Sequence, residues 1–484
     1  MNNILKLISS SCLLCYDAKC DKSCPNNFKP SNMLRSLRFN NELGALKDIK
    51  KDICLKCDGY CENNCIHFDK KVRIKDAIKL LKEEDINVSD ISLETTFLNV
   101  KCENPFFLSS SIVTATYEMC KRALEMGFAG VVTKTISFYN SKEVSPRFSM
   151  INDYNNSFIG FKNLEQLSEY SVEYNLDIIK KLKKEFPNKV IIASIMGQEE
   201  EEWTKLASLV TDAGADLIEC NFSCPQMAKE GLGSDVGCNE ALVKKFTKAT
   251  VKGTKLPVIT KMTPNITSIK LPAIASYEAG AKGISAINTI KCLTNINLDT
   301  MVGDPDVSNK TAISGYSGRA VKPIALRFIK DLSEIDGVEL SGIGGIESYY
   351  DALEYISLGC RIVQLTTSVM EYGYRIIDDL ILGTKLFLKN HNYKSINDII
   401  GLAKDNIIPA SDLDRESIIY PIIDYDKCIS CKRCYISCRD GGHQAIYLDD
   451  DKVKIDAKKC VGCHLCYLVC PINAINKTKR INKK

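Results

Sequence analysis

The chain has 484 residues, of which 45% are hydrophobic and 26% charged, and its net charge is +4. This length predicts roughly two to four domains of ordinary globular composition. The interspersed Lys and Glu exclude the concentrated basic face of a nucleic-acid-binding protein, and no apolar run reaches the roughly 18 residues that span a bilayer.

Cysteine is unusually frequent, with 23 residues. The opening segment MNNILKLISSS has an apolar stretch that is too short, and too interrupted by Lys6, for a secretory signal. Disulfides suit small secreted domains rather than a long chain without such a signal. We therefore expect free thiols in a reducing cytoplasm.

Residues 1–90 hold two groups of four cysteines and predict a helical iron–sulfur domain. The first group is Cys12, Cys15, Cys20 and Cys24, and the second is Cys54, Cys57, Cys61 and Cys65. Between the groups, residues 31–50 carry Met33, Leu34, Leu37, Leu43 and Leu46 near helical spacing. We expect a helical spacer that brings the two groups together.

Residues 91–385 alternate short apolar runs with amphipathic stretches. Eight runs predict strands, at 106–110, 130–134, 190–195, 216–220, 257–261, 283–288, 338–341 and 361–365. Strand–helix units of this number and length predict a (β/α)8 TIM barrel. A doubly wound open sheet is the alternative, but no G-x-G-x-x-G opens a helix after the first strand, which disfavours a dinucleotide fold.

Polar residues follow the carboxyl ends of six of these strands, the rim where such barrels carry their active sites. In chain order they are Lys134-Thr135, Asn221 to Pro225, Lys261, Asn288-Thr289, Gly342 to Gly345 and Thr366-Thr367. One polar residue at a strand end usually caps the backbone or faces solvent. Their joint occurrence on one rim predicts a functional site.

The glycine-rich turn GIGG after the seventh strand suits a phosphate, because backbone N–H groups at a turn and a helix start donate to an anion. Thr366 and Thr367 would add hydroxyl donors. Flavin mononucleotide is the natural cofactor, since it takes single electrons from clusters and passes two as hydride. Lys134 or Lys261 would then stabilise negative charge on the reduced ring.

Cys224 stands alone after the fourth strand, without C-x-x-C partners. A thiol with an ordinary pKa of about 8.5 exchanges protons near neutral pH, so Cys224 is the candidate acid/base; a structural thiol or a cluster ligand is the alternative. Asn163, Asn221 and Asn288 would read a planar amide-bearing substrate, because each carboxamide offers a donor and an acceptor. A carboxylate substrate would call for an Arg or Lys fork instead.

Residues 386–420 predict a helical connector to a ferredoxin-like module at 421–484. The spacing C-x2-C-x2-C-x3-C occurs there twice, as Cys428, Cys431, Cys434 and Cys438 and as Cys460, Cys463, Cys466 and Cys470. This is the two-cluster ferredoxin pattern, in which the fourth cysteine of each run reaches over to the other [4Fe-4S] cluster. Zinc sites usually pair C-x2-C units across a longer gap.

Six segments resemble the catalytic subunit of bacterial NAD-dependent dihydropyrimidine dehydrogenases: NFSCPQM, ITKMTPN, AINTIKC, ISGYSGRAVKPIALRFI, SGIGGIE and GLAKDNIIPASDLDRESIIYP. The resemblance covers about residues 95–478. It implies a barrel of dihydroorotate-dehydrogenase type and the reversible reduction of uracil or thymine to the 5,6-dihydropyrimidine. Flavin N5 would exchange hydride with ring C6, and Cys224 would be the acid/base at ring C5.

The resemblance also assigns binding residues. It implies substrate contacts at Asn163, Asn221, Phe222, Ser223, Asn288 and Thr289. It implies FMN contacts at Ser110, Lys134, Thr135, Lys261, Gly318, Ile343, Gly344, Gly345, Thr366 and Thr367.

The segment CLLCYDAKCDKSCP resembles a different piece, the helical cluster domain that opens the partner subunit, the large eukaryotic dihydropyrimidine dehydrogenase and the glutamate synthase small subunit. By that analogy Cys12, Cys15, Cys20 and Cys65 would hold one [4Fe-4S] cluster, and Cys24, Cys57 and Cys61 with Cys54 another, which makes four in the chain. The second group departs from the family by its spacing C-x2-C-x3-C-x3-C. Cys54 is the candidate for the fourth ligand of that cluster.

The chain carries no FAD- or NAD(P)H-binding fingerprint, so electrons would come from a separate flavoprotein subunit or from ferredoxin. We expect a homodimer or heteromer with no nucleic-acid or membrane partner. Two alternatives stay open: a dihydroorotate dehydrogenase-like enzyme, which also uses an active-site Cys and several Asn, and a non-catalytic flavin/iron–sulfur electron-transfer protein. A tRNA dihydrouridine synthase shares the flavin barrel but would need a basic RNA-binding face.

Overall fold

The computed structural model describes residues 3–67, 70–82, 84, 86–139, 141–153, 157–227 and 231–483. The chain divides into two compact units, Met1–Lys404 and Asp405–Lys484. Among the helices of the described ranges, none combines the length and the apolar character needed to cross a bilayer.

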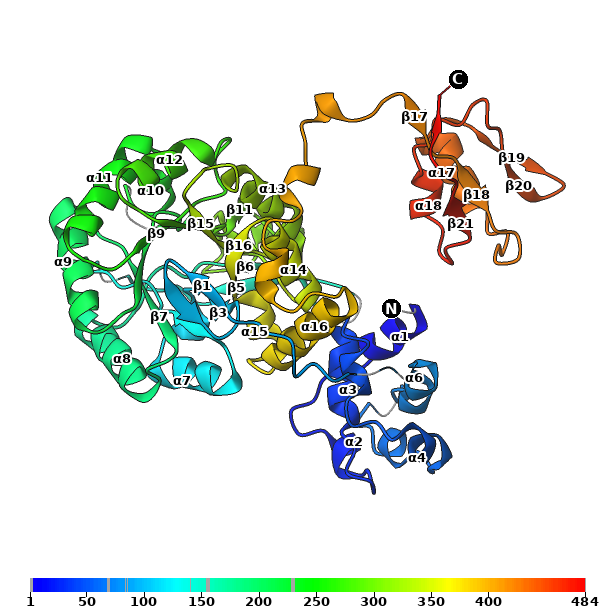
Figure 1. Ribbon diagram of the computed structural model, residues 1–484, viewed down its shortest axis with the longest axis horizontal. Coiled ribbons are helices and arrows are strands. Elements are labelled where there is room, and N and C mark those ends of the chain that lie inside the picture. The colour runs from blue at the N-terminus through cyan, green and yellow to red at the C-terminus, as the bar shows by residue number, and fades with distance from the viewer. Residues whose placement is uncertain are drawn as a thin grey trace. The chain divides into compact units, whose positions relative to one another are not determined.

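A closed barrel of eight parallel strands lies in the first unit (Figure 1). Successive neighbours around it are β3 (Phe106–Leu108), β4 (Gly130–Val132), β7 (Val190–Ile195), β8 (Leu217–Asn221), β9 (Val258–Lys261), β10 (Gly283–Ala286), β15 (Glu339–Ile343) and β16 (Cys360–Leu365). Spatial order follows chain order, and all eight predicted strands are confirmed. The alternative of an open sheet is wrong, because β16 pairs with β3 and closes the ring.

The strands are apolar because both of their faces are covered. Every residue of β7, for example, is buried, as expected for a parallel strand with helices outside and packed side chains inside. The surrounding helices are α7 (Tyr117–Met126), α8 (Val172–Glu185), α9 (Glu200–Asp212), α11 (Glu240–Lys252), α12 (Lys270–Glu278), α13 (Lys322–Leu332), α14 (Tyr349–Ser357), α15 (Thr367–Tyr372) and α16 (Ile376–Asn390). Their apolar stripes face the strands, and Trp203 and Leu206 of α9 are fully buried.

Two insertions cover the ends of the barrel. A hairpin of β1 (Thr95–Phe97) and β2 (Val100–Cys102) packs Phe97 against residues at the amino ends of the strands, including Phe107 and Val190. At the carboxyl end lies a four-stranded antiparallel sheet in the order β11 (Ile290–Cys292), β14 (Ser314–Ser317), β6 (Phe158–Asn163), β5 (Phe148–Asn152). This sheet was not predicted, and it supplies part of the site wall.

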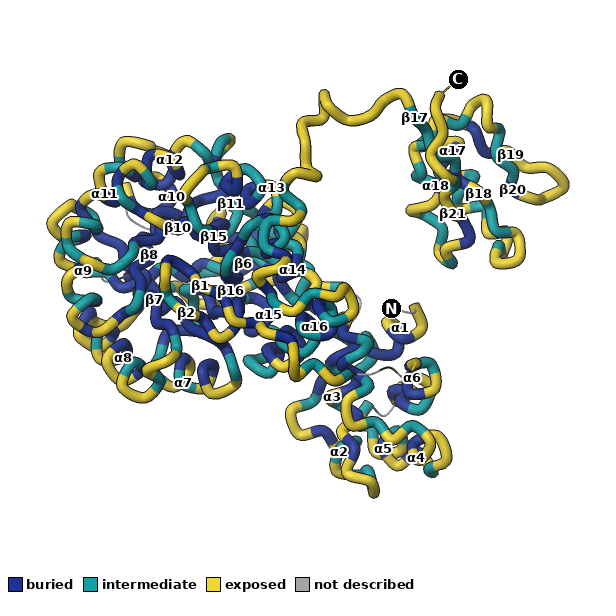
Figure 2. Tube along the Cα trace, in the orientation of Figure 1, coloured by how far each residue is buried: buried dark blue, intermediate teal, exposed yellow. Residues whose placement is uncertain are grey.

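The helical module at the N-terminus has its own core of Leu5, Ile8, Met33, Leu34 and Leu37 (Figure 2). Its helices are α1 (Asn3–Ser10), α2 (Lys19–Lys22), α3 (Pro30–Arg38), α4 (Lys51–Lys56), α5 (Tyr60–Asn63) and α6 (Ile74–Leu80). The predicted helix over 31–50 is wrong beyond Arg38. Asn40 has a φ of +58°, which ends α3, and only the short 3-10 turn Gly44–Leu46 follows.

The prediction of a helical connector over 386–420 is also wrong for most of its length. Helix α16 enters it and stops at Asn390, next to Asn392 with a φ of +62°. Only short 3-10 turns follow, at Ile396–Ile399, Lys404–Asn406 and Ala410–Asp412. Residues 405–416 are exposed throughout, so this stretch is a solvated chain rather than a helix.

The second unit is built from short pieces around its cysteines. Strand pairs are β17 (Ser417–Ile418) with β22 (Ile481–Asn482), β18 (Pro421–Ile423) with β21 (Ile475–Lys477) and β19 (Ile446–Asp449) with β20 (Lys452–Ile455). Each cysteine run leads into a helix, α17 (Arg433–Gly441) or α18 (Leu465–Leu468). The small core includes Cys438, Ile446, Val453 and Cys466.

Candidate active site and cluster sites

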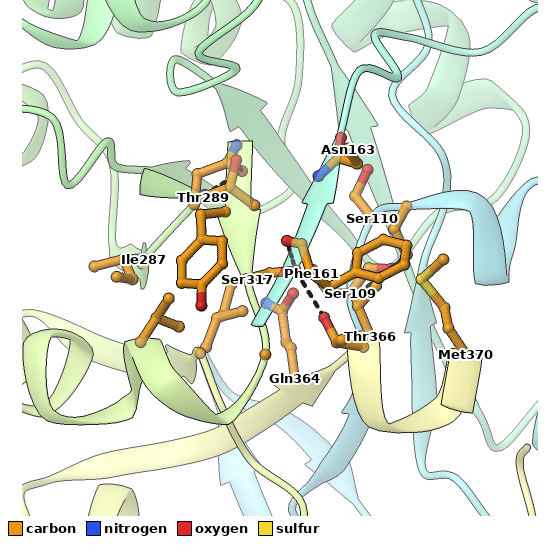
Figure 3. A pocket seen from close by; sticks show the side chains of 18 of the residues that line it. Ser109, Ser110, Phe161, Asn163, Ile287, Thr289, Ser317, Gln364, Thr366 and Met370 are labelled. Carbon is orange, nitrogen blue, oxygen red and sulfur yellow. Dashed lines mark hydrogen bonds between the residues drawn. The ribbon is translucent and has the colours of Figure 1, made fainter. Parts of the chain in front are cut away.

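A polar cavity lies at the carboxyl ends of the barrel strands and occupies about 1080 Å³ with its open mouth. Figure 3 shows residues of β6, β16 and α15, among them Asn163, Gln364 and Met370, around the same space. Most of the residues predicted from the sequence line it, namely Ser110, Lys134, Thr135, Asn163, Asn221, Cys224, Lys261, Asn288, Thr289, Gly318, Ile343, Gly344, Gly345, Thr366 and Thr367. The structure thus brings together side chains from strands far apart in sequence.

Two predicted residues do not line the cavity. Phe222 is fully buried, and its ring lies 5.1 Å from that of Trp203 in the layer between barrel and helices. Side chains alternate along a strand, so the neighbour of the inward-facing Asn221 faces outward. Ser223 is buried too and acts only through its neighbours, since its Oγ bonds Asn221 and Asn288.

Cys224 follows β8 and is 6% exposed. Burial raises the pKa of its thiol to about 11, although the backbone N–H of Gln226 and the charge of Lys134 oppose the rise. The thiol is therefore protonated at neutral pH. A protonated thiol can donate a proton but is a weak nucleophile.

A chain of hydrogen bonds orients two of the asparagines. Asn221 Nδ2 donates to Thr135 Oγ1 at 2.9 Å, while its Oδ1 accepts from Ser223 Oγ at 3.0 Å. Asn288 Nδ2 donates to Ser223 Oγ at 2.8 Å, and its Oδ1 accepts from the Thr289 N–H at 2.8 Å. The amides are fixed before a ligand binds, which lowers the entropic cost of recognition.

Asn163 is held by a residue that the sequence alone did not single out. Gln226 Nε2 donates to Asn163 Oδ1 at 3.1 Å and to the Glu165 carbonyl at 2.5 Å. Its Oε1 is buried and has no hydrogen-bond partner within the described ranges. Gln226 therefore ties the Cys224 segment to β6 and leaves an acceptor free in the site.

The cations of the cavity wall are paired with carboxylates. Lys134 bonds Glu165 at 2.8 Å, and both side chains are 8% exposed. Lys261 lies 3.7 Å from the fully buried Glu219, and Arg319 bonds Asp153 at 2.8 Å. Glu165 and Glu219 escaped prediction because a lone acidic residue in a sequence gives no hint of a distant cation.

The floor of the cavity is a polar layer inside the barrel. Gln364 Nε2 donates to Ser341 Oγ at 2.8 Å and to Ser285 Oγ at 3.2 Å. Lys261 Nζ donates to Ser109 Oγ at 3.1 Å. Gln364 Oε1 is buried without a hydrogen-bond partner in the described part of the chain. It can therefore accept a hydrogen bond from a ligand in the cavity.

The wall near β15 fits the phosphate group of a flavin. Gly344 and Gly345 have φ values of +131° and +69°, and a Cβ on Gly345 would come within 2.9 Å of the Lys322 backbone nitrogen. Thr366 and Thr367 stand opposite, held by hydroxyl contacts to Ser111 and Ser317. A close backbone approach in a glycine-rich turn with nearby hydroxyls is the arrangement that binds phosphate in such barrels.

All 23 cysteines are free thiols, and sixteen of them gather in four sets. Cys12, Cys15, Cys20 and Cys65 line one cavity of about 410 Å³, and Cys428, Cys431, Cys434 and Cys470 line another of about 380 Å³. Burial and the neighbouring thiols of Cys24 and Cys57 raise the pKa of Cys54 and of Cys61. Burial likewise raises the pKa of Cys460, whose neighbours are Cys463 and Cys438, and of Cys466, whose neighbours are Cys434, Cys460 and Cys463. The fourth cysteine of each C-terminal run thus sits with the other run.

Two of the thiol sets line apolar cavities. Within the described residues, no three Cys, His, Asp or Glu side chains converge tightly enough to hold one metal ion. A cubane asks for a wider cage, since each of its four thiolates binds a different iron. The two apolar, cysteine-lined cavities offer such a cage.

Fold and site together define a flavin-binding barrel oxidoreductase joined to an iron–sulfur module. The dihydroorotate dehydrogenase family matches residues 92–388, and the 4Fe-4S dicluster domain matches residues 421–477. The chain belongs to the dihydroorotate dehydrogenase family. Membership implies FMN in the barrel, and the second match implies iron–sulfur clusters in the C-terminal unit.

Within that family the chain is similar to several curated proteins. It is 52% identical over 357 residues to the PreA subunit of NAD-dependent dihydropyrimidine dehydrogenase from Escherichia coli K12, which covers 73% of this chain and 87% of the relative. It is 37% identical to the chloroplastic dihydropyrimidine dehydrogenase (NADP(+)) of Arabidopsis thaliana, over 66% of this chain and 79% of the relative. It is 36% identical to the catalytic subunit of dihydroorotate dehydrogenase B (NAD(+)) from Pyrococcus abyssi, over 64% of this chain and 99% of the relative.

Proposed function

We propose that the protein is a dihydropyrimidine dehydrogenase-type oxidoreductase that interconverts uracil or thymine with the 5,6-dihydropyrimidine. The observation that carries the choice of substrate is the charge balance of the cavity. Each cationic side chain of its wall, Lys134, Lys261 and Arg319, already faces a carboxylate, whereas the asparagines present oriented neutral amides. A neutral pyrimidine matches this site better than orotate, whose carboxylate needs a free cation.

The residues of the chain would divide the reaction between them. Asn163, Asn221 and Asn288 hold the ring by its alternating C=O and N–H groups. Bound FMN, held by Gly344, Gly345, Thr366 and Thr367, would supply the hydride for ring C6. Cys224 gives its proton to ring C5 during reduction and, as the thiolate, takes it back during oxidation.

The lysines would serve the flavin ring. Lys134 and Lys261 are buried next to carboxylates that keep each pair close to neutral. Either cation then stabilises the negative charge of the reduced ring without a high cost of burial. Ser110, Thr135, Gly318 and Ile343 complete the wall on that side.

The sixteen gathered cysteines would hold four [4Fe-4S] clusters, two in each iron–sulfur module. Electrons would reach them from an FAD/NAD(P)H flavoprotein subunit or from ferredoxin. The PreA relative is named as a subunit, which supports a heteromer.

The test is an anaerobic single turnover. The protein is reduced chemically, freed of excess reductant and mixed with uracil, thymine or orotate while flavin reoxidation is followed. Rapid reoxidation by uracil or thymine is the expected result. Reoxidation by orotate alone would make it a dihydroorotate dehydrogenase, and silence with all three would leave an electron-transfer protein.

A further inference from the structure

The helical module is fixed to the barrel by a buried polar contact. Arg35 Nε donates to Asp379 Oδ2 at 2.8 Å, and Ser36 Oγ donates to Asp379 Oδ1 at 2.5 Å. Asp379 belongs to α16 and is 3% exposed at its side chain. Phe39 follows α3 and packs edge-on against Tyr372, the last residue of α15, at 5.0 Å. Helices α3, α15 and α16 therefore form one packed assembly.

This contact brings one cysteine set against the barrel. Leu14 lies between Cys12 and Cys15, and its carbonyl accepts a hydrogen bond from Arg375 Nη2 at 2.6 Å. Arg375 directly precedes α16, and three residues before it α15 ends at Tyr372. The loop that carries the first two thiols thus rests on the junction of α15 and α16.

The other end of α15 borders the flavin cavity. Thr367, Ser368 and Met370 of this helix line it. Helix α15 has six residues and spans only about 9 Å. A second cavity, of about 790 Å³, lies beside the helix between Arg38 and Phe39 of the module and Gly345, Glu347 and Tyr372 of the barrel. Gly345 and Glu347 line both cavities, so the flavin cavity and the cavity that faces the module share a wall there.

We propose that the N-terminal module is the electron port of the flavin in its own chain, with the set Cys12, Cys15, Cys20 and Cys65 as the step next to the flavin. The set Cys24, Cys54, Cys57 and Cys61 then accepts electrons from the outside donor. The proposal rests on the cofactors of the proposed function but not on its substrate.

The number of electrons that the clusters supply equals the number that the reduction of one pyrimidine needs. Two reduced clusters each give up one electron, and the flavin takes up both together with one proton from solvent. The pair leaves as hydride to ring C6 while the Cys224 proton goes to ring C5. A one-electron carrier or a flavoprotein subunit then recharges the clusters, and Cys224 regains its proton from water.

The test uses the full chain with the C-terminal clusters disabled by Cys431→Ser and Cys463→Ser. After chemical reduction, mixing with uracil should still reoxidise the N-terminal clusters, at a rate within tenfold of wild-type turnover. N-terminal clusters that stay reduced through many wild-type turnover times would overturn the proposal.

Two further measurements keep the result interpretable. In the same variant, partial reduction without pyrimidine should give a flavin radical whose spin relaxation is hastened by a reduced cluster; normal relaxation would also refute the route. If uracil fails to oxidise even the wild type, the proposed function falls while this readout still decides the route.

A matched pair of variants probes the contact itself. Asp379→Ala should slow cluster-to-flavin transfer at least tenfold without loss of iron, because it removes the acceptor of Ser36 and the shorter of the two ion pairs of Arg35. Asp378→Ala removes only the 3.2 Å pair to Arg35 from a carboxylate that is 55% exposed, and it should change the rate much less. Equal rates in both variants would count against the contact as the path.

Discussion

Cys224 has its proton held by burial, and this decides how its chemistry should depend on pH. Its pKa is raised to about 11, so the acid form that reduction needs is present at all pH values below that. The rate of pyrimidine reduction by the reduced enzyme should stay flat through the neutral range and fall only as pH approaches about 11. A stopped-flow pH profile checks this, and a fall centred near pH 8.5 would show an ordinary thiol.

Replacing Cys224 separates acid catalysis from binding. Cys224→Ala should reduce turnover by about 10²–10⁴-fold, the range by which a positioned acid speeds proton transfer. Flavin content should remain that of the wild type, because Cys224 is not among the residues proposed to hold the flavin. Turnover near the wild-type rate would remove Cys224 as the acid.

We expect Gln226 to affect substrate binding indirectly, by orienting Asn163. Gln226→Met keeps the size of the side chain but removes its bonds to Asn163 and the Glu165 carbonyl, each worth about 1 kcal/mol. KM for uracil should rise by about tenfold with a smaller change in kcat, since Asn163 loses its orientation. Gln226→Glu should be worse, because its carboxylate would face two acceptors; steady-state kinetics that rank the two in the opposite order would contradict this role.

At the scale of elements, we expect the turn after β15 to set the flavin affinity. Gly345→Ala places a Cβ against the backbone of Lys322 at a φ of +69°, so the turn must open. The purified variant should carry much less flavin than the wild type, measured by absorbance after denaturation. Gly373→Ala is the matched control, since Gly373 also has a positive φ of +81° but no neighbouring atom within 4 Å. Equal loss in both would point to backbone strain rather than to the cradle.

The barrel strands were readable from the sequence because both of their faces are buried, which leaves uninterrupted apolar runs such as that of β7. Strand β5 was not readable: it alternates exposed and half-buried residues and looks like a loop until it pairs with β6. The helix through 31–50 was overextended, since apolar spacing continues past Asn40 while the backbone does not.

The candidate site was predictable to the extent that barrel geometry places strand ends on one rim. Asn221 and Lys261 follow from that rule alone. Glu165 and Gln226 do not, because their importance comes from partners that only the fold brings near. Phe222 shows the opposite case. Its place in the NFSCPQM motif suggested a substrate contact, but side chains alternate along a strand, and its ring packs against Trp203 outside the cavity.

At the scale of the whole molecule, the number of clusters is the clearest prediction. Anaerobically purified protein should contain about sixteen irons per chain if all four cysteine sets are filled. Cys12→Ser with Cys15→Ser should lower the count to about twelve. A wild-type count of about eight would mean that the N-terminal sets are empty.

The packing of Phe39 determines how far the chain can be truncated or its domains exchanged. Although the sequence places a boundary near residue 90, Phe39 is buried in the hydrophobic core of the barrel rather than in that of its own module. A protein truncated to the barrel alone would have a cavity beside Tyr372 where Phe39 packs. It would also leave the buried Asp379 without the hydrogen bonds from Arg35 and Ser36. The N-terminal module and the barrel are therefore mutually dependent in their packing. Replacing the module with one from another protein would require transferring Arg35, Ser36 and Phe39 along with the cysteines.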